Sequence, residues 1–305
     1  MKGKKKNMNK YYLGIDGGGT KTAICLIDEK LNIVSSSVSG PSSYDTVPLE
    51  TMKTNIESAL NNLSFNGEIV SVFAGLGGIA KQDDTKIVKN VLLSIPVLSN
   101  AIIEVDNDIV NAYYSALGNQ DGIVVIIGTG SVAYGIHNGK AHRCGGYCYQ
   151  EGDAGSSYDM GKKALQYYAK VIDKRLPSSS FADAIAQEIN VYTFGDLAHY
   201  FINATRTQIA SLSKIVTANS DNDYARKIIV NGVNDILEMI DTVFNELNFE
   251  QAKISIIGSL GNADTLYREM LLKELSKRNI NYVPLKYEAY LGSSIKALIN
   301  YERTQ

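Results

Sequence analysis

The 305-residue sequence predicts an α/β protein built from two related αβ units. Short apolar strands alternate with segments of helical period, and a glycine-rich turn, Asp16–Thr20, closes the first strand. A second such turn, Gly128–Ser131, closes a later strand, and each turn is followed by another strand and a polar turn. This shared plan indicates an internal structural repeat. A chain of this length also exceeds one ordinary core, which favours two domains.

Apolar runs and their period define the elements of the first unit. The three leading strands are short and bounded by Gly and Asp, which predicts an antiparallel meander. The expected order is βββαβαβα, with strands at 11–16, 22–27, 31–38, 69–74 and 101–105 and helices at 49–63, 84–93 and 107–117.

The second unit repeats the strands and then becomes mostly helical. An Asn138-Gly139 pair, a strong hairpin signal, separates its second and third strands. Amphipathic period predicts the helices. We expect strands at 122–127, 132–136, from 140 and at 253–257, and helices at 153–171, 181–189, 208–216, 224–247, 263–277 and 292–301.

Composition excludes several classes of function. The net charge of −2 gives no electrostatic case for binding nucleic acid or an anionic membrane. No stretch reaches the roughly 20 apolar residues of a membrane span, and no signal-peptide pattern is present, so we expect a cytoplasmic protein. Three cysteines argue against a disulfide scaffold, and Cys144 and Cys148 lack the further ligands of a zinc site.

The first glycine turn carries a phosphate-binding pattern. Its glycines, Gly18 and Gly19 among them, let backbone N–H groups approach an anion, while Thr20 adds a hydroxyl and Lys21 a charge. Asp16 stands at the carboxyl end of a strand, where a carboxylate beside phosphates suits Mg²⁺. The alternative is a sharp hairpin with exposed polar residues.

Two later glycine turns are less specific. Thr129, Gly130 and Ser131 occupy the matching position of the repeat, which strengthens their assignment as a second phosphate turn. Gly258 and Gly261 follow a buried strand and would either admit a flat base or cap the next helix. No Walker motif occurs, and the GxGxxA-like stretches lack a Rossmann context.

Asp108 is the candidate general base. It follows a strand and opens a helix, a position from which a carboxylate can accept a proton from a substrate hydroxyl. Helix capping is the equally weighted alternative, and whether Asp106 shares the role stays open.

The densest polar stretch spans residues 145–158. Its glycines, aromatic rings and carboxylates suit a sugar, with Gly146, Tyr147 and Asp153 as candidates. A glycine-rich loop with Asp153 as a helix cap is the structural alternative.

Together these residues resemble the sugar kinase, heat-shock protein 70 and actin superfamily. The closer resemblance is to the N-acetylglucosamine kinase branch, grouped with the BadF/BadG/BcrA/BcrD-type ATPases. It covers nearly the whole chain and is anchored by "GIDGGGTKT", "NDIVNA", "IGTGS", "GGYCYQEGDAGSSYDMG" and "IIGSLG".

The resemblance implies two ribonuclease-H-like lobes with a central nucleotide and sugar cleft. They would span residues 1–117 and 118–305, the second with a helical insertion, and whether the last helix, about 291–302, returns to the first lobe is open. The cofactors would be ATP and Mg²⁺, with Asp16 holding the metal directly or through water. Residue by residue, the first phosphate loop would be Asp16, Gly18, Gly19, Thr20 and Lys21, the second Thr129, Gly130 and Ser131, the adenosine border Gly258 and Gly261, the base Asp108, and the sugar site Ser43, Asp108, Thr129, Gly146, Tyr147 and Asp153.

Three departures from similar kinases bear on the substrate. They usually have Trp at Tyr147, often Glu at Ala154, and an Asn where Ser43 stands; the loss of that Asn would suit a sugar with a bulkier ring substituent. The expected reaction is ATP-dependent phosphorylation of N-acetylglucosamine, N-acetylmuramic acid or both, at O6, by a homodimer. The alternatives are a kinase of glucosamine or another hexose, an ATPase that activates a radical dehydratase, and a sensing regulator on the same fold.

Overall fold

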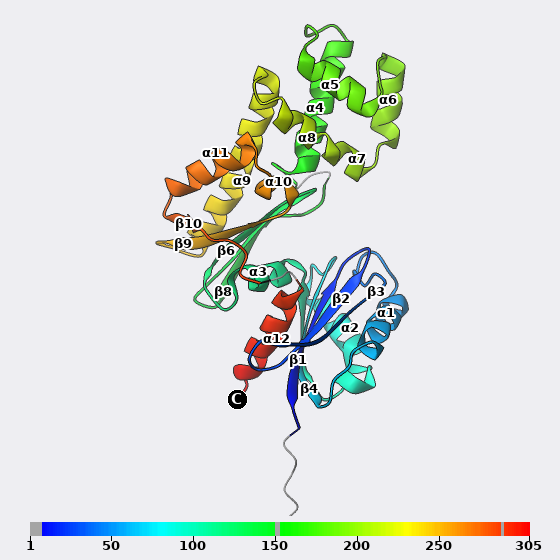
Figure 1. Cartoon of the computed structure of the whole chain (residues 1–305), viewed down its shortest axis with the longest axis vertical. Coiled ribbons are helices and arrows are strands. Elements are labelled where there is room, and N and C mark those ends of the chain that lie inside the picture. Colours follow the sequence, from blue (N-terminus) through cyan, green and yellow to red (C-terminus); the bar gives the residue numbers. More distant parts are fainter. Residues whose placement is uncertain (1–7, 150–152, 288–289) are drawn as a thin grey trace, which may run out of the picture. The chain divides into compact units, whose positions relative to one another are not determined.

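The computed structural model describes residues 8–149, 153–287 and 290–305. The chain divides into two compact units, each with its own five-stranded mixed sheet (Figure 1). Unit 1 comprises residues 1–120 and 285–305, and unit 2 comprises residues 121–284. The predicted α/β class is confirmed.

The sheet of unit 1 has the strand order β3-β2-β1-β4-β5. β1 pairs antiparallel with β2, and β2 with β3, while β4 and β5 add parallel strands on the other side of β1. The antiparallel meander is therefore confirmed. The strands are β1 (Lys10–Gly17), β2 (Thr22–Ile27), β3 (Ile33–Ser39), β4 (Glu68–Leu76) and β5 (Ile102–Asn107).

The third strand starts two residues later than predicted. Leu31 has a φ of +63° and belongs to the turn after β2. The Asp28 carboxylate accepts hydrogen bonds from the backbone N–H groups of Lys30 and Asn32, which fixes this turn and delays the strand.

Helices cover the sheet of unit 1 and bury its apolar side chains. Met52 and Ile56 of α1 and Val88 and Leu92 of α2 are completely buried. The helices are α1 (Leu49–Asn61), α2 (Gln82–Leu93), the short 3₁₀ helix η1 (Pro96–Leu98), α3 (Ile109–Leu117) and α12 (Leu291–Glu302).

The last helix, α12, packs on the sheet of unit 1 beside α3 (Figure 1). Two glycines permit this approach, because a Cβ atom at Gly14 of β1 would collide with the backbone of Ser294, and one at Gly292 with the backbone of Asn111. Ser294 Oγ also donates to the carbonyl of Cys25 at 2.8 Å. Small residues thus let backbones of distant segments meet closely.

Unit 2 repeats the sheet plan of unit 1. Its strand order is β10-β9-β6-β7-β8, with an antiparallel β6-β7-β8 meander and parallel β9 and β10 beside β6. Asn138 and Gly139 both have positive φ, as the predicted hairpin turn requires. The strands are β6 (Gly122–Ile127), β7 (Ser131–His137), β8 (Lys140–Gly145), β9 (Ala252–Ile257) and β10 (Ile280–Tyr282).

The helices of unit 2 depart from prediction in several places, including the unpredicted four-residue α10. The helix predicted from residue 153 begins at Ser157, because Gly155 has a φ of +75° and Ser156 caps the helix through the N–H of Asp159. The helix predicted over 208–216 is divided at Leu212, and α6 was not predicted, since Leu197 is its one buried residue. The helices are α4 (Ser157–Ile172), α5 (Ser180–Ile189), α6 (Phe194–Asn203), α7 (Arg206–Ser211), α8 (Ser213–Ala218), α9 (Asp223–Glu246), α10 (Ser259–Asn262) and α11 (Leu266–Ser276).

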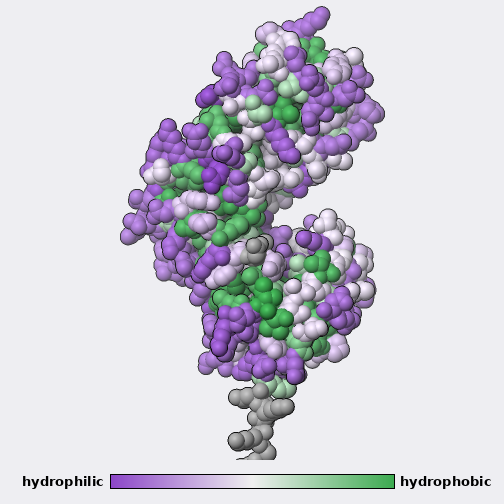
Figure 2. All heavy atoms as spheres, in the orientation of Figure 1, coloured by the Kyte–Doolittle hydropathy of each residue, from purple (hydrophilic) through white to green (hydrophobic). Residues whose placement is uncertain are grey.

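The long helix α9 supplies much of the core of unit 2. Ile229, Ile236, Ile240 and Val243 of this helix are completely buried. On the face drawn in Figure 2, hydrophilic side chains cover most of the visible surface of each unit, with smaller apolar areas among them. Among the described residues, no helix is both long enough and apolar enough to cross a membrane.

We predict that Gly14→Ala lowers the free energy of unfolding by about 1–3 kcal/mol, the usual cost of forcing an extra methyl group into a packed interior. Gly195→Ala is the control, because a Cβ atom there meets no heavy atom within 4 Å and the residue lies in α6. Urea titrations of both variants test this. An unchanged midpoint for Gly14→Ala would contradict the close packing of α12 on β1.

Candidate functional site

The predicted site residues fall into both units. Unit 1 holds Asp16, Gly18, Gly19, Thr20, Lys21, Ser43 and Asp108. Unit 2 holds Thr129, Gly130, Ser131, Gly146, Tyr147, Asp153, Gly258 and Gly261.

The first glycine turn joins β1 to β2. The N–H of Gly18 donates to the carbonyl of Lys21 at 2.9 Å, and the carbonyl of Gly18 accepts from the N–H groups of Ser42 and Ser43. Gly19, Thr20 and Lys21 are exposed at the tip. The base of the turn is therefore fixed by its neighbours, while its tip can meet a ligand.

Asp16 is held by a side chain from α3. Asn111 Nδ2 donates to Asp16 Oδ1 at 2.8 Å and to the carbonyl of Gly75 at 2.9 Å. Both partners are acceptors, which fixes the orientation of this amide. Burial raises the pKa of Asp16, and the negative charge of Asp108 raises it further, whereas the Asn111 hydrogen bond and the charge of Lys21 lower it. The two carboxylates of the predicted site thus interact electrostatically.

Asp108 stands at the N-terminus of α3 but does not cap the helix with its side chain. The side chain of Asn107 accepts a hydrogen bond from the N–H of Ile109 at 3.2 Å instead. Asp106 accepts from the N–H of Asn107 at 2.7 Å. The side chain of Asn107 therefore provides a hydrogen bond at the start of α3 that capping by Asp108 would otherwise supply.

Ser43 lies close to Asp108 across Gly77. A Cβ atom at Gly77 would lie 2.7 Å from Ser43 Oγ and 3.6 Å from Asp108 Oδ2, so the glycine leaves room for both polar groups. Ser43 Oγ donates to Asp45 Oδ1 at 2.6 Å. Asp45 was missed by sequence reasoning, and the one available signal was a carboxylate two residues after the predicted serine.

The second glycine turn joins β6 to β7 and is tied to the segment before α4. The carbonyl of Gly128 accepts from the N–H of Ser157 at 2.9 Å. Ser131 is buried; its N–H donates to Asp153 Oδ1 at 3.2 Å, and its hydroxyl donates to the carbonyl of Ala154 at 2.7 Å. The hydroxyl of Ser131 is thus engaged in holding the fold.

Asp153 forms an ion pair that the sequence did not suggest. Arg206, at the start of α7, donates from Nη2 to Asp153 Oδ2 at 2.7 Å. Asp153 is 6% exposed, whereas the Arg206 side chain is 41% exposed. The two residues are 53 positions apart, so no local pattern could have joined them.

A pocket of about 250 Å³ lies beside the second glycine turn in unit 2. Gly258 has a φ of +106° and immediately precedes α10, and a Cβ atom at Gly261 would collide with Ile256. Both glycines therefore shape the chain beside the pocket. Its lining is rich in hydroxyl groups and consists of Thr129, Ser157, Thr207, Ala210, Ser211, Ser213, Lys214, Thr217, Ser259, Leu260 and Ala263.

The remaining predicted sugar residues follow β8. Gly146 has a φ of +70°, and its carbonyl accepts from Arg143 Nη2 at 2.6 Å. The Tyr147 side chain is 86% exposed. Gln150, Glu151 and Gly152 of the same predicted segment lie outside the described residues.

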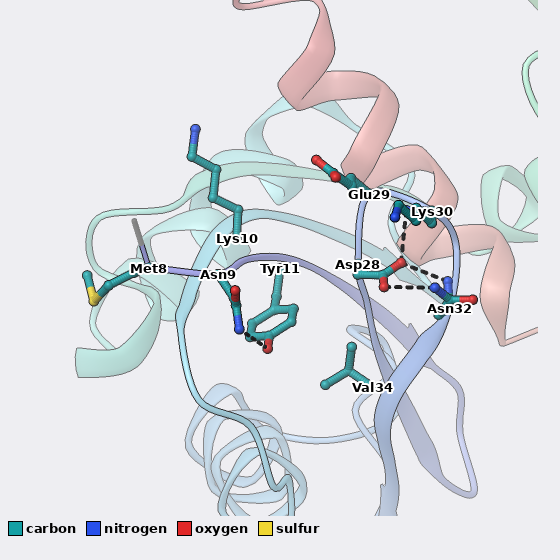
Figure 3. Close-up of a pocket in the computed structure, with 9 residues that line it drawn as sticks. All are labelled: Met8, Asn9, Lys10, Tyr11, Asp28, Glu29, Lys30, Asn32 and Val34. Atoms are coloured by element: carbon teal, nitrogen blue, oxygen red, sulfur yellow. Dashed lines mark hydrogen bonds between the residues drawn. The ribbon is translucent and has the colours of Figure 1, made fainter. Parts of the chain in front are cut away.

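A larger hollow of about 610 Å³ lies at the opposite end of β1 from Asp16 (Figure 3). It is lined in part by Asp28, whose carboxylate accepts hydrogen bonds from its own turn, as drawn in Figure 3. These bonds, chiefly that from the Asn32 side chain, lower the pKa of Asp28. Asp28, Lys30 and Asn32 thus serve the turn, while Asn9 and Lys10 of the same lining bond to Tyr11 and Tyr301.

The donor set fits magnesium that arrives with a nucleotide. Over residues 8–149, 153–287 and 290–305, no three or more His, Cys, Asp or Glu side chains gather as a metal cage. Mg²⁺ commonly uses one or two carboxylates together with water and phosphate oxygens. Asp16, half-buried beside an exposed glycine turn, meets that requirement.

The repeated sheet and its two glycine turns define a protein of the actin-like ATPase fold class. Two solved structures support this: a putative N-acetylglucosamine kinase from Chromobacterium violaceum (TM-score 0.71, 21% identity, 96% of this chain and 99% of that chain) and a ROK family glucokinase from Streptomyces griseus (TM-score 0.56, 16% identity, 95% and 98%). At these identities they establish the fold alone.

The chain belongs to the BadF/BadG/BcrA/BcrD ATPase family, whose model matches residues 13–295. It is 27% identical over 302 residues to a Clostridium acetobutylicum protein named N-acetylmuramic acid/N-acetylglucosamine kinase, covering 94% of this chain and 98% of that protein. It is 25% identical over 291 residues to the N-acetyl-D-glucosamine kinase of Dictyostelium discoideum, covering 88% and 89%. The resemblance inferred from the motifs is confirmed.

We predict that Asp16→Asn stabilises the folded protein at neutral pH, by about 1 kcal/mol, the scale of a typical single substitution. Because the pKa of Asp16 is raised in the folded protein, its negative charge lowers the free energy of unfolding above that pKa. This destabilisation disappears as the pH falls, because the carboxylate is then protonated in both the folded and the unfolded state.

Thermal unfolding of wild type and Asp16→Asn between pH 4 and 8 measures this difference, which should shrink toward pH 4. Asp83→Asn is the control, since its side chain is 83% exposed. Equal unfolding temperatures for wild type and Asp16→Asn at every pH would contradict a charge at Asp16 that disfavours folding.

Proposed function

We propose that this protein transfers the γ-phosphoryl group of ATP to a hydroxyl of an N-acetylated amino sugar, N-acetylglucosamine, N-acetylmuramic acid or both. The observation that carries the proposal is the pair of glycine turns at the same strand–turn–strand position of both sheets, one of them beside Asp16. The names of the Clostridium acetobutylicum and Dictyostelium discoideum relatives support the substrate class.

Each unit contributes a part of the nucleotide site in this proposal. In unit 1 the exposed N–H groups and side chains of Gly19, Thr20 and Lys21 bind phosphate oxygens, and Asp16 holds Mg²⁺ directly or through water. In unit 2 Thr129 and Gly130 bind phosphate, and the 250 Å³ pocket beside Gly258 and Gly261 receives the adenosine. Mg²⁺ would offset the negative charge of the triphosphate during transfer.

Asp108 is the proposed general base. Its carboxylate accepts the proton of the attacking hydroxyl, which we assign to O6, the primary and least hindered hydroxyl of the sugar. Ser43 lies across Gly77 from Asp108 and is placed to contact the same sugar. Gly146, Tyr147 and Asp153 are the proposed sugar contacts of unit 2. Phosphoryl transfer then depends on positioning more than on covalent chemistry.

Localisation and assembly are proposed on likeness to sugar kinases. We propose a cytoplasmic homodimer, and light scattering on the purified protein tests the dimer. The substrate is tested by an ATP-coupled screen over N-acetylglucosamine, N-acetylmuramic acid, N-acetylmannosamine, glucosamine and glucose, and a rate with glucose equal to that with the acetylated sugars would contradict the proposed class.

We predict that Asp108→Asn lowers kcat by about 10²-fold or more, the usual scale of general base catalysis, while ATP affinity is kept. Asp106→Asn is the matched control, because Asp106 accepts a hydrogen bond from the N–H of Asn107, which an asparagine oxygen can also accept. Steady-state kinetics and nucleotide titrations measure both. An unchanged kcat for Asp108→Asn would remove Asp108 from this role, and an equal loss for Asp106→Asn would show that the two share it.

A further inference from the structure

Arg206 is a partly exposed cation fixed beside the second glycine turn. Its Nη2 donates to Asp153 Oδ2 at 2.7 Å, and a Cβ atom at Gly130 would lie 2.8 Å from the same nitrogen. The guanidinium also lies over the ring of Tyr149, with its central carbon 5.3 Å from the ring centroid. Three parts of unit 2 therefore meet at this side chain: the turn, the segment before α4, and α7.

The ion pair fixes Arg206 before any ligand arrives. Asp153 is almost fully buried, and its second oxygen already accepts from the N–H of Ser131. A buried carboxylate without its cation is strongly unfavourable, so Arg206 is needed to neutralise it. The arginine is thus held in place by the folded protein, and a ligand that uses it does not have to order a long side chain.

The pair leaves most of the guanidinium available. A guanidinium has five N–H donors, and among the described residues Arg206 uses one of them in the hydrogen bond to Asp153. The Tyr149 ring lies within cation–π distance of the group and adds a second contact that holds it. The outer edge can then offer two parallel donors, the arrangement that matches a planar carboxylate.

We propose that Arg206 binds the carboxylate of an acidic amino sugar and so selects N-acetylmuramic acid, with its lactyl carboxylate, over neutral amino sugars. The proposal rests on the proposed kinase function and names the charge class of its substrate. Asp153 and Tyr149, which hold the guanidinium, both belong to the segment assigned to the sugar. A terminal phosphate of ATP is the competing anion, because Gly130 of the phosphate turn is also adjacent to Arg206.

The test compares kcat/KM for N-acetylmuramic acid and for N-acetylglucosamine in wild type, Arg206→Met and Arg206→Lys. A hydrogen-bonded charge pair is typically worth a factor of about 10–100 in affinity. Arg206→Met should therefore lose about 10–100-fold more activity on N-acetylmuramic acid than on N-acetylglucosamine, with an unchanged KM for ATP. Arg206→Lys keeps the charge without the two parallel donors, so its kcat/KM for N-acetylmuramic acid should lie between those of wild type and Arg206→Met.

The methyl ester of N-acetylmuramic acid supplies the matching change in the substrate. Wild type should act on this neutral ester as poorly as Arg206→Met acts on the free acid. Arg175→Met is the control for the loss of an arginine from unit 2, because Arg175 pairs with the neighbouring Asp173 on the surface. It should behave as wild type on both sugars.

Four results would overturn the proposal. An equal loss on both sugars would reduce Arg206 to a support for Asp153, and a raised KM for ATP alone would assign it to phosphate. A wild type that phosphorylates N-acetylglucosamine but not N-acetylmuramic acid would refute the acidic substrate and leave the kinase function standing. A wild type that phosphorylates no sugar in the screen would refute the kinase function itself.

Discussion

The side-chain amide of Asn111 is the contact on which unit 1 depends most. It joins α3 to the ends of β1 and β4 by donating to Asp16 and to the carbonyl of Gly75. The amide occupies the space that a Cβ atom at Gly75 would need, and the backbone of Asn111 fills the space that one at Gly292 would need. One residue therefore fixes both the carboxylate proposed to hold Mg²⁺ and the docking of the last helix.

The contact between Asn111 and Asp16 includes groups whose burial is unfavourable for folding. The Oδ1 atom of Asn111 is buried and has no hydrogen-bond partner among the described residues. The pKa of Asp16 is raised because its charge is buried and lies near Asp108. Buried polar groups that lack partners are uncommon and often mark functional positions. In unit 1 one such group, Asn111 Oδ1, belongs to the side chain that holds Asp16, where a cation is proposed to bind.

The two units have the same strand–turn–strand plan but carry different residues at the ends of their strands. Thr22 and Ser131 begin the second strand of each meander, and the hydroxyl of each is engaged by the chain nearby. The strand ends differ, because Asp16 pairs with Ala23 in unit 1 whereas Ile126 pairs with Val132 at the matching place in unit 2. The repeat therefore supplies two glycine turns but a strand-end carboxylate in unit 1 alone.

The sequence by itself determined the strands other than the three-residue β10, both meanders, the glycine turns and the family. Each of these depends on neighbouring residues: apolar period, hairpin signals and glycines at strand ends. Helix α6 was not predicted, because its single buried residue gives no apolar periodicity along the sequence. Only the tertiary structure decided the contacts of Asn111 with Asp16, 95 positions away, and of Arg206 with Asp153. Such pairs are set by the packing of distant elements, and no local spacing encodes which buried carboxylate meets which donor.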